Sequence, residues 1–493
     1  MTGLFARKPI APLDEDETHG LKRVLGAGDL IMLAIGAVIG AGIFGAIGTA
    51  AAGQVGPDGV VLRYGAGPAL VISFLLLGGA CALAALCYAE LAAMIPQAGS
   101  AYAYVYATLG ELAAWIIGWD LVLEYAVGNV AVAISWGDYF STLLRGVGIV
   151  LPAWLTTGYR TALLSANSDV HGLLHTAPQI AGVPILVNVP AFVVVSLITW
   201  LLLRGARETA RVNNVMVVIK LLALGLFVAV GVTHLHPAYF EPFAPNGFTG
   251  IHQGAAIVFF AYIGFDAIST AAEETINPQR NLPIGILVGL AVCTGIYIIV
   301  GLVLTGMVPY QQLAVADPLA RALEIAGFTR IGWVVALGAV VSMAAVLLVF
   351  QYGQPRIFFS MARDGLLPPW AARVDRTTRI PWATTLVTGV VVALGSLVGD
   401  AAETYDLTNI GTLFAFALVC AGVLILRVAE PDRPRPFRVP LVWVVAPLGV
   451  GACVFIMLGL PVQSWQRFGW WLAIGAVIYF SYGRRHSRLR LRR

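Results

Sequence analysis

The feature that most constrains this chain is an apolar run from about Leu30 to Ala52. A run of that length can cross the hydrocarbon core of a bilayer as a helix. Four glycines nevertheless fall within ten residues near its middle, namely Gly36, Gly40, Gly42 and Gly45. Each glycine costs a helix interior about 1 kcal/mol relative to alanine, so the cluster favours a break in the helix. The segment alone also allows the alternative, a stripe of small residues for close helix packing.

A helix that opens at membrane depth has consequences for function. Open backbone is tolerated there only where it lines a cavity or lies inside protein. The half-helix that begins after the break presents free N–H groups and the positive end of its dipole. Such an end suits a carboxylate, and interrupted spans bind the substrate in many membrane carriers. The segment therefore predicts a substrate site in mid-membrane.

The composition is that of an integral membrane protein. Of 493 residues, 59% are hydrophobic and 11% are charged, whereas soluble domains carry about 25% charged residues. Residues 1–28 are mixed and polar, with no signal-peptide pattern, so we expect a cytosolic tail. All five cysteines fall in apolar runs, where we expect free, buried thiols.

Twelve apolar segments follow one another along the chain. They cover about residues 29–52, 67–92, 113–144, 184–203, 213–233, 251–276, 283–308, 331–360, 381–399, 405–427, 439–460 and 469–482. Twelve spans put both termini on one side of the membrane. The loops and tails of that side hold 23 of the 30 Lys and Arg residues, and those of the other side hold 6. The positive-inside rule therefore predicts a multi-pass protein of the cell (inner) membrane with cytoplasmic termini.

Two connecting segments have their own patterns. The aromatic stretch 101–106, with three tyrosines, suits the membrane interface. The long segment 145–183 reads as a linker, and it holds His171 and His175 at a spacing that metal ligands can have. Because no third ligand is near them in the sequence, we expect no metal there.

A second interrupted span is predicted within residues 257–271. Gly264 and Asp266 lie near its centre, and Asn277-Pro278 closes it. It is the sixth span, so it runs opposite to the first. Corresponding interrupted helices of opposite direction are typical of an inverted repeat. We therefore predict two halves, 29–233 and 251–427, followed by two more spans at 439–482 and a basic cytosolic tail at 483–493.

Three ionisable side chains, Glu124, Lys220 and Asp266, fall inside predicted spans. A charge in mid-membrane costs about 2.5–3.5 kcal/mol on insertion scales, so each needs a reason. Lys220 either reaches toward the membrane surface or occupies a cation's place beside the opened first span. In the second case it would gain and lose a proton where a sodium-coupled carrier gains and loses Na⁺. The two acids either partner a helix end or a hydroxyl, such as that of Tyr125, Tyr262 or Tyr297, or act in transport.

Several segments carry a resemblance to a known family. They are Ile39-Gly40-Ala41-Gly42-Ile43-Phe44, the run from Gly99 through Tyr106 to Trp119, Val212-Asn213-Asn214, the run from Phe260 through Asp266 to Pro278, and the run from Ala362 to Pro368. From about residue 22 to past 430, the chain resembles the amino acid–polyamine–organocation superfamily and, within it, the cationic amino acid transporter family. The resemblance implies an all-α fold of about 12 transmembrane helices in a five-plus-five inverted repeat of the LeuT type, with discontinuous spans 1 and 6.

The resemblance also implies a set of substrate contacts. The α-carboxylate would rest on backbone N–H groups of the first break, at Gly40, Ala41 and Gly42, with Val38 and Ile43 beside them. The α-amine would bind the carbonyl groups of Phe260, Ala261 and Ile263 in the second break. Many relatives have Ser or Thr where this chain has Ala41. A hydroxyl contact to the carboxylate is therefore lost, and only backbone contacts remain.

We assign ion coupling and substrate specificity to four side chains. Lys220 matches the family's buried lysine, to which sodium-free coupling is credited, and Glu124 and Asp266 match acids near the cavity. We place Phe350 of the eighth span against the substrate side chain, where its bulk would favour small amino acids. Either acid would favour cationic substrates if it reached the substrate side chain. We expect neutral or broad specificity.

The sequence thus predicts a proton-coupled secondary transporter that imports L-amino acids by alternating access. The alternatives are a sodium-coupled carrier, an amino acid or polyamine exchanger, and a non-transporting amino acid sensor. We expect no cofactor, metal or nucleic acid; the expected partners are the amino acid, protons and membrane lipids, and a small accessory subunit is left open. An ATP-driven pump is disfavoured by the missing P-loop, and an enzyme by the missing catalytic motifs.

Overall fold

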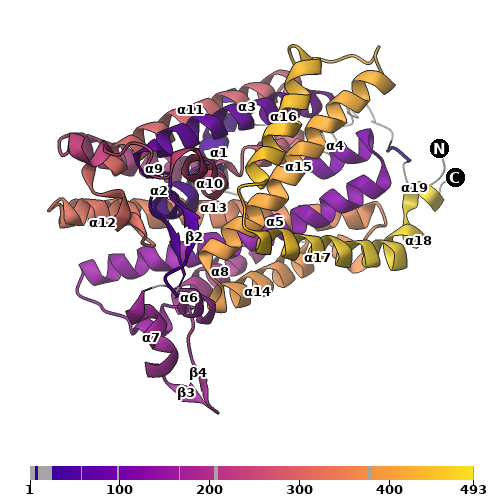
Figure 1. The fold of residues 1–493 in the computed structure, drawn as a ribbon. Coiled ribbons are helices and arrows are strands. Elements are labelled where there is room, and N and C mark those ends of the chain that lie inside the picture. The colour runs from indigo at the N-terminus through magenta and orange to yellow at the C-terminus, as the bar shows by residue number, and fades with distance from the viewer. Residues whose placement is uncertain are drawn as a thin grey trace.

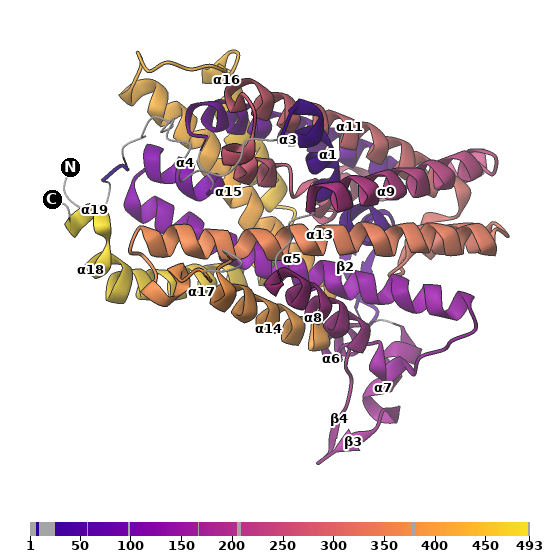
Figure 2. The ribbon, with the colours of Figure 1, turned by 180° about the vertical axis from the view of Figure 1, so that it is seen from behind.

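The computed structural model is a bundle of long helices that lie side by side (Figure 1). It describes residues 6–8, 25–56, 58–96, 99–165, 167–204, 209–375 and 380–491. Two helices, α5 (Glu111–Gly146) and α13 (Thr329–Arg363), run along the length of the molecule next to each other (Figure 2). The remaining spans pack around this pair.

The other elements follow in chain order. The first part holds α1 (Ala27–Val38), α2 (Ile47–Ala52), β1 (Gly53–Val55), β2 (Val61–Tyr64), α3 (Leu70–Met94), α4 (Ser100–Thr108), α6 (Tyr159–Leu164), α7 (Ser168–Thr176), β3 (Gln179–Ile180), β4 (Val183–Pro184), α8 (Val189–Leu203) and α9 (Thr209–Val232). The second part holds α10 (Gly247–Val258), α11 (Pro278–Met307), α12 (Pro318–Ile325), α14 (Trp382–Val398), α15 (Ala401–Ala429), α16 (Val442–Met457), α17 (Val462–Ile478), α18 (Arg484–His486) and α19 (Arg488–Leu491).

Every predicted span contains a helix or a broken helix of the described chain. Seven helices are long and apolar enough to cross a membrane, and two bent pairs raise the number to nine. One bent pair is α1 with Gly42–Ala52, and the other is α16 with Val462–His486. The helices α8 and α14 are apolar but shorter. The prediction of an all-α, multi-span membrane fold is confirmed, whereas the division into two inverted halves stays a prediction.

The segment 145–183 is more than the linker that we expected. It contains α6, α7 and the antiparallel hairpin of β3 and β4, which projects from the bundle in Figure 1. A small separate core of Ala162, Ala177 and Leu186, with Trp154 packed against it, holds this part together. The two helices and two strands are each too short to show a hydrophobic period in the sequence, which is why the prediction missed them.

The outer faces of the bundle are apolar, as the surface of a span that meets lipid must be. On α14, Val387, Val390, Val391 and Leu394 are all exposed. The same helix buries Thr384, Thr385 and Thr388. A helix that turns apolar groups outward and small polar groups inward reverses the pattern of a soluble protein, and this supports the membrane assignment.

The tyrosines of residues 101–106 point into the protein and not toward lipid, and their level at the membrane interface stays a prediction. Tyr102, Tyr104 and Tyr106 are buried in α4, which packs inside the bundle. The Tyr102 hydroxyl donates to Asp364, 2.8 Å away at the end of α13. An aromatic run suits an interface or a core equally well, and here helix packing decides for the core.

The described parts of the two tails meet at one end of the bundle. The Lys8 ammonium lies 2.8 Å from the Asp364 carboxylate, and the Arg488 N–H donates to the Asp364 carbonyl. The Glu111 N–H at the start of α5 donates to the Ala6 carbonyl. This common end agrees with an even number of membrane crossings.

Candidate functional site

The first span is broken where its glycines gather. The helix α1 ends at Val38, and Ile39 has an extended backbone. The chain then resumes helix as a π-helical turn, Gly42–Ala46, that continues into α2. The two parts differ in direction by 44°. The first N–H groups of a resumed helix have no acceptor within it. Those of Ala41, Gly42 and Ile43 are therefore available to a bound anion.

The glycines at this break also allow very close packing. A methyl group at Gly42 would lie 2.3 Å from the Ala261 Cα, and one at Gly40 would lie 2.7 Å from the Val346 side chain. Ala261 belongs to the break of the sixth span. The two breaks therefore touch, and both interpretations of the glycine cluster, an opened helix and close packing, hold at once.

The sixth span is broken at the same depth. The helix α10 ends at Val258 and a 3₁₀ turn, Phe259–Tyr262, follows. Ile263 is extended, and Gly264 has φ of +117°, which favours glycine. A second 3₁₀ stretch, Asp266–Glu274, leads to α11. The prediction that Gly264 and Asp266 interrupt this span agrees with its geometry.

Lys220 lies beside the first break. Its side chain is fully buried, and its ammonium donates to the carbonyl groups of Gly36 at 2.7 Å and Ile39 at 2.8 Å. These are the last carbonyls of α1, the negative end of a helix, where a cation is favoured. Of the two interpretations of Lys220, reaching to the surface is excluded by its burial, and the place of a cation beside the opened span fits.

Two hydroxyl groups donate to backbone carbonyls at the breaks. Ser342 of α13 donates to the Ile39 carbonyl at 2.9 Å. The Tyr297 hydroxyl of α11 lies 3.0 Å from the Val38 carbonyl and 2.7 Å from the Ala261 carbonyl. Tyr297 therefore joins the first break to the second. The expectation that Tyr262 or Tyr297 partners a buried acid is wrong, since the Tyr262 hydroxyl donates to the Phe74 carbonyl.

Two of the carbonyl groups predicted to bind the substrate amine already accept other hydrogen bonds. The Ala261 carbonyl already accepts from Tyr297, and the Phe260 carbonyl receives a long contact of 3.4 Å from the Ile263 N–H. A carbonyl has two lone pairs, so each can still accept another donor. The Phe260 ring packs against the Tyr405 ring of α15 at a tilt of 54°, with ring centroids 4.5 Å apart.

The acids lie on the far side of the second break from Tyr405, toward the tails. Asp266 is buried, with the Ser100 hydroxyl of α4 3.4 Å away. Glu124 of α5 is buried within electrostatic range of Asp266. One turn before it, both carboxylate oxygens of Asp120 are buried without a hydrogen-bond partner among the described residues. A buried polar group without a partner is costly, so this region is a candidate for water, protons or ligand.

Comparison with known proteins decides the family. The sequence profile of the family described as amino acid permease matches residues 25–481. The chain belongs to the amino acid permease family. The predicted membership of the amino acid–polyamine–organocation superfamily is confirmed, and the permease is a transporter and not an enzyme.

Three relatives of the permease cover most of its length. It is 43% identical to the methylthioribose transporter of Bacillus subtilis over 99% of this chain and 100% of that protein. It is 45% identical to the branched-chain amino acid permease BcaP of the same organism over 95% of each chain. It is 35% identical to the vacuolar cationic amino acid transporter 4 of Arabidopsis thaliana over 88% of this chain and 68% of that protein.

The ring of Phe350 in the permease packs on Tyr125 of α5 at 5.3 Å between centroids, and its atoms come within 3.2 Å of where a Gly128 methyl would be. Its placement against the substrate side chain stays a prediction. Two earlier residues of α13 contact the first break, Ser342 at the Ile39 carbonyl and Val346 beside Gly40. The sequence analysis missed Val346 and Ser342. Their spacing of four from each other and from Phe350 puts all three on one face of α13, and this was the signal that could have found them.

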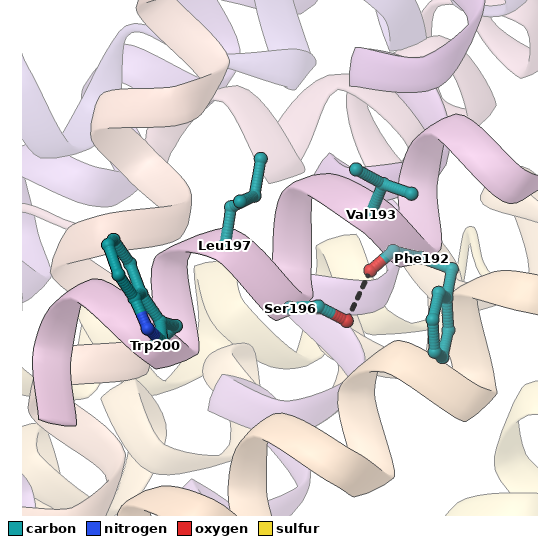
Figure 3. Close-up of a pocket in the computed structure, with 5 residues that line it drawn as sticks. All are labelled: Phe192, Val193, Ser196, Leu197 and Trp200. Atoms are coloured by element: carbon teal, nitrogen blue, oxygen red, sulfur yellow. Dashed lines mark hydrogen bonds between the residues drawn. The ribbon is translucent and has the colours of Figure 1, made fainter.

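One surface pocket of the permease lies away from the breaks. It has a volume of 350 Å³, and its lining residues, Phe192, Val193, Ser196, Leu197 and Trp200, all belong to α8 (Figure 3). Its one hydroxyl, that of Ser196, donates to the Phe192 carbonyl at 2.8 Å. The pocket has no charged side chain in its lining to bind the carboxylate or ammonium of an amino acid, so the facing breaks remain the candidate site.

Proposed function

We propose that the permease is a secondary transporter that imports L-amino acids across the cell membrane, with cytoplasmic termini, by alternating access and in symport with protons. The observation that carries this proposal is the meeting of two broken spans in mid-membrane. One break offers helix N–H groups to a carboxylate, and the other offers carbonyl groups to an ammonium. An α-amino acid carries both groups on adjacent atoms, so it fits between breaks that touch.

Proton coupling is proposed from the position of Lys220. Its ammonium contacts two carbonyls at the end of α1, which is where a discontinuous span of this kind holds a coupling cation. Loss of the proton would weaken the contacts of Lys220 with the carbonyls of Gly36 and Ile39, of which the second would keep its bond from Ser342, and would loosen α1 from α9. A protonation step there would link the movement of α1 to the proton gradient.

A small or neutral side chain is proposed for the preferred substrate, or broad specificity. On the side toward α15, the space beside the breaks is bounded by the packed rings of Phe260 and Tyr405. On the side toward α13, it is bounded by Val346. These groups are apolar or aromatic. Glu124 and Asp266 lie on the other side, and a cationic side chain would have to reach past Ala261 to meet them.

Uptake into proteoliposomes tests this proposal. Labelled alanine, leucine and arginine would each be supplied under an inward proton gradient and, separately, under an inward sodium gradient. We expect proton-driven alanine or leucine uptake that needs no sodium. Dependence on sodium would point to a sodium-coupled carrier, flux only against internal amino acid to an exchanger, and binding without flux to a sensor; each would contradict the proposal.

A second substrate class follows from a relative. The methylthioribose transporter of Bacillus subtilis matches this chain over its whole length, and methylthioribose, the substrate in its name, has no α-amino acid group. Methylthioribose would therefore be included as a competitor in the alanine assay. If unlabelled alanine inhibits the uptake of labelled alanine and methylthioribose does not, the result supports an amino acid site. Inhibition by methylthioribose but not by unlabelled alanine would contradict it.

A further inference from the structure

A groove on the side of the bundle combines apolar walls with a charged rim. It has a volume of 480 Å³ and lies among α5, α14 and α15, with α6 and α17 at its rim. Val127 of α5, Val391 of α14 and Leu407 of α15 represent its apolar walls. The charged rim is Arg160 of α6, Glu403 of α15 and Arg467 of α17. None of these residues belongs to either broken span.

The rim is an ion-paired triad with a surplus positive charge. Arg160 donates to Glu403 through two N–H groups, both at 2.8 Å, and Arg467 donates to the same carboxylate at 2.6 Å. Two guanidinium groups thus share one carboxylate. A guanidinium has five N–H donors, so most donors of both arginines stay free for another acceptor. Planar guanidinium groups with free donors are the side chains that best bind phosphate.

The arginines are held in place over the groove. The Thr161 hydroxyl, next to Arg160, donates to the Gly399 carbonyl at the end of α14, at 3.1 Å. Glu403 lies in the first turn of α15, whose N-cap Asp400 accepts from the Glu403 N–H and does not line the groove. The rim is therefore a fixed structure at the ends of two spans and not a chance contact of surface side chains.

The depth of the groove matches a lipid. α13 ends at the side where the tails meet, so α14 runs away from that side, and the turn between α14 and α15, to which Arg160 and Thr161 are hydrogen-bonded, lies at the opposite membrane surface. Arg160 is then at the level of the headgroups. Val391 lies two turns before the end of α14, about 10 Å deeper at 1.5 Å per residue. The exposed Val387 and Leu394 continue this apolar surface along α14.

We propose that this groove binds a glycerophospholipid from the membrane leaflet opposite the tails. Its phosphate rests against Arg160 and Arg467, and one acyl chain lies between α5, α14 and α15. The positive surplus of the rim complements the phosphate, and the valine and leucine walls complement the chain. The lipid bridges α6 and α17 to the helices beneath, so it stabilises this end of the bundle.

Native mass spectrometry of the purified full-length permease tests the site. Delipidated protein would be titrated with phosphatidylglycerol, with diacylglycerol and with inorganic phosphate. We expect one tightly held phosphatidylglycerol and a rise in thermal midpoint. Diacylglycerol, which lacks the phosphate, and free phosphate, which lacks the chains, should each give at least ten-fold weaker binding.

Two kinds of variant separate the rim from the walls. Arg160→Gln with Arg467→Gln should lower phospholipid occupancy at least ten-fold, and Val391→Trp, which fills the groove and keeps both arginines, should do the same. The matched control is Arg321→Gln with Arg330→Gln, two exposed arginines at the same end of the bundle; it should bind lipid as the wild type does. Retention of lipid by the double rim variant, equal binding of diacylglycerol, or an equal response to free phosphate would overturn the proposal.

Discussion

At the scale of single residues, the central feature is the contact between a glycine and a backbone. No side chain fits at Gly42, because a methyl group there would lie 2.3 Å from the Ala261 Cα and 2.5 Å from its nitrogen. The neighbouring atoms are backbone and cannot turn away as a flexible side chain can. Gly42 thus sets how closely the two breaks approach each other.

Replacing Gly42 by alanine should therefore separate the breaks. We expect a loss of about 1–3 kcal/mol in the free energy of unfolding from overpacking, together with at least ten-fold weaker alanine binding. Thermal unfolding and equilibrium binding of the purified protein measure the two effects. The matched control is Gly79→Ala in α3, where a methyl group meets no atom within 4 Å. If Gly42→Ala bound alanine as Gly79→Ala does, the breaks would not form the substrate site.

The glycines and Lys220 could be recognised from the sequence because each breaks a rule for its surroundings. A glycine cluster contradicts a continuous helix, and a lysine contradicts an apolar span. Ser342, Val346 and Tyr297 break no such rule, and nothing in an apolar helix marks which face meets a partner distant in the sequence.

At the scale of elements, the hairpin after the first span locks onto α15. Arg63 of β2 donates to Asp406 through both terminal nitrogens, one of them at 2.8 Å, and both side chains are buried. The adjacent Tyr405 hydroxyl is hydrogen-bonded to Ser135 of α5. A methyl group at Gly45, just after the first break, would touch both of these hydroxyls. The hairpin, α15 and α5 thus close over the breaks on the side opposite the tails.

Breaking this pair from one side should be costly. We expect Asp406→Asn to lower the free energy of unfolding by about 3–5 kcal/mol, because Arg63 is left buried and unpaired. The double variant Arg63→Gln with Asp406→Asn should recover much of that loss. Arg321→Gln, which breaks an exposed pair with Glu324, should cost about 1 kcal/mol or less. Equal effects of Asp406→Asn and Arg321→Gln in unfolding experiments would mean that the hairpin contributes little to the fold.

At the scale of the whole molecule, charge asymmetry and structure agree on an even number of crossings. The described parts of both tails converge on Asp364, while α6 and α7, which follow α5 in the chain, project from the side of the bundle (Figure 1). The multi-span, all-α fold was predictable because long apolar runs are the strongest signal in a membrane sequence. The small elements between residues 147 and 188 were not, since they depend on a local core of a few residues.

The orientation can be tested by labelling single cysteines. The five native cysteines are all buried, so their background should be low. Cysteine at the exposed Ser168 in α7 should react in whole cells with a membrane-impermeant thiol reagent. Cysteine at the exposed Asp432, between α15 and α16, should react only after the cells are opened. The opposite pattern would place the termini outside the cell.

The central proposal for this protein is that Lys220 links the opening of the first span to a proton. The most direct test follows proton entry into proteoliposomes with an internal pH dye when alanine is added, in the absence of sodium. We predict that wild-type protein acidifies the lumen, and that Lys220→Met, which keeps a chain of similar length without the charge, does not. The exposed Leu222→Met on the same helix should behave as the wild type does. Alanine-driven acidification that persists in Lys220→Met, or a requirement for sodium in the wild type, would contradict the account.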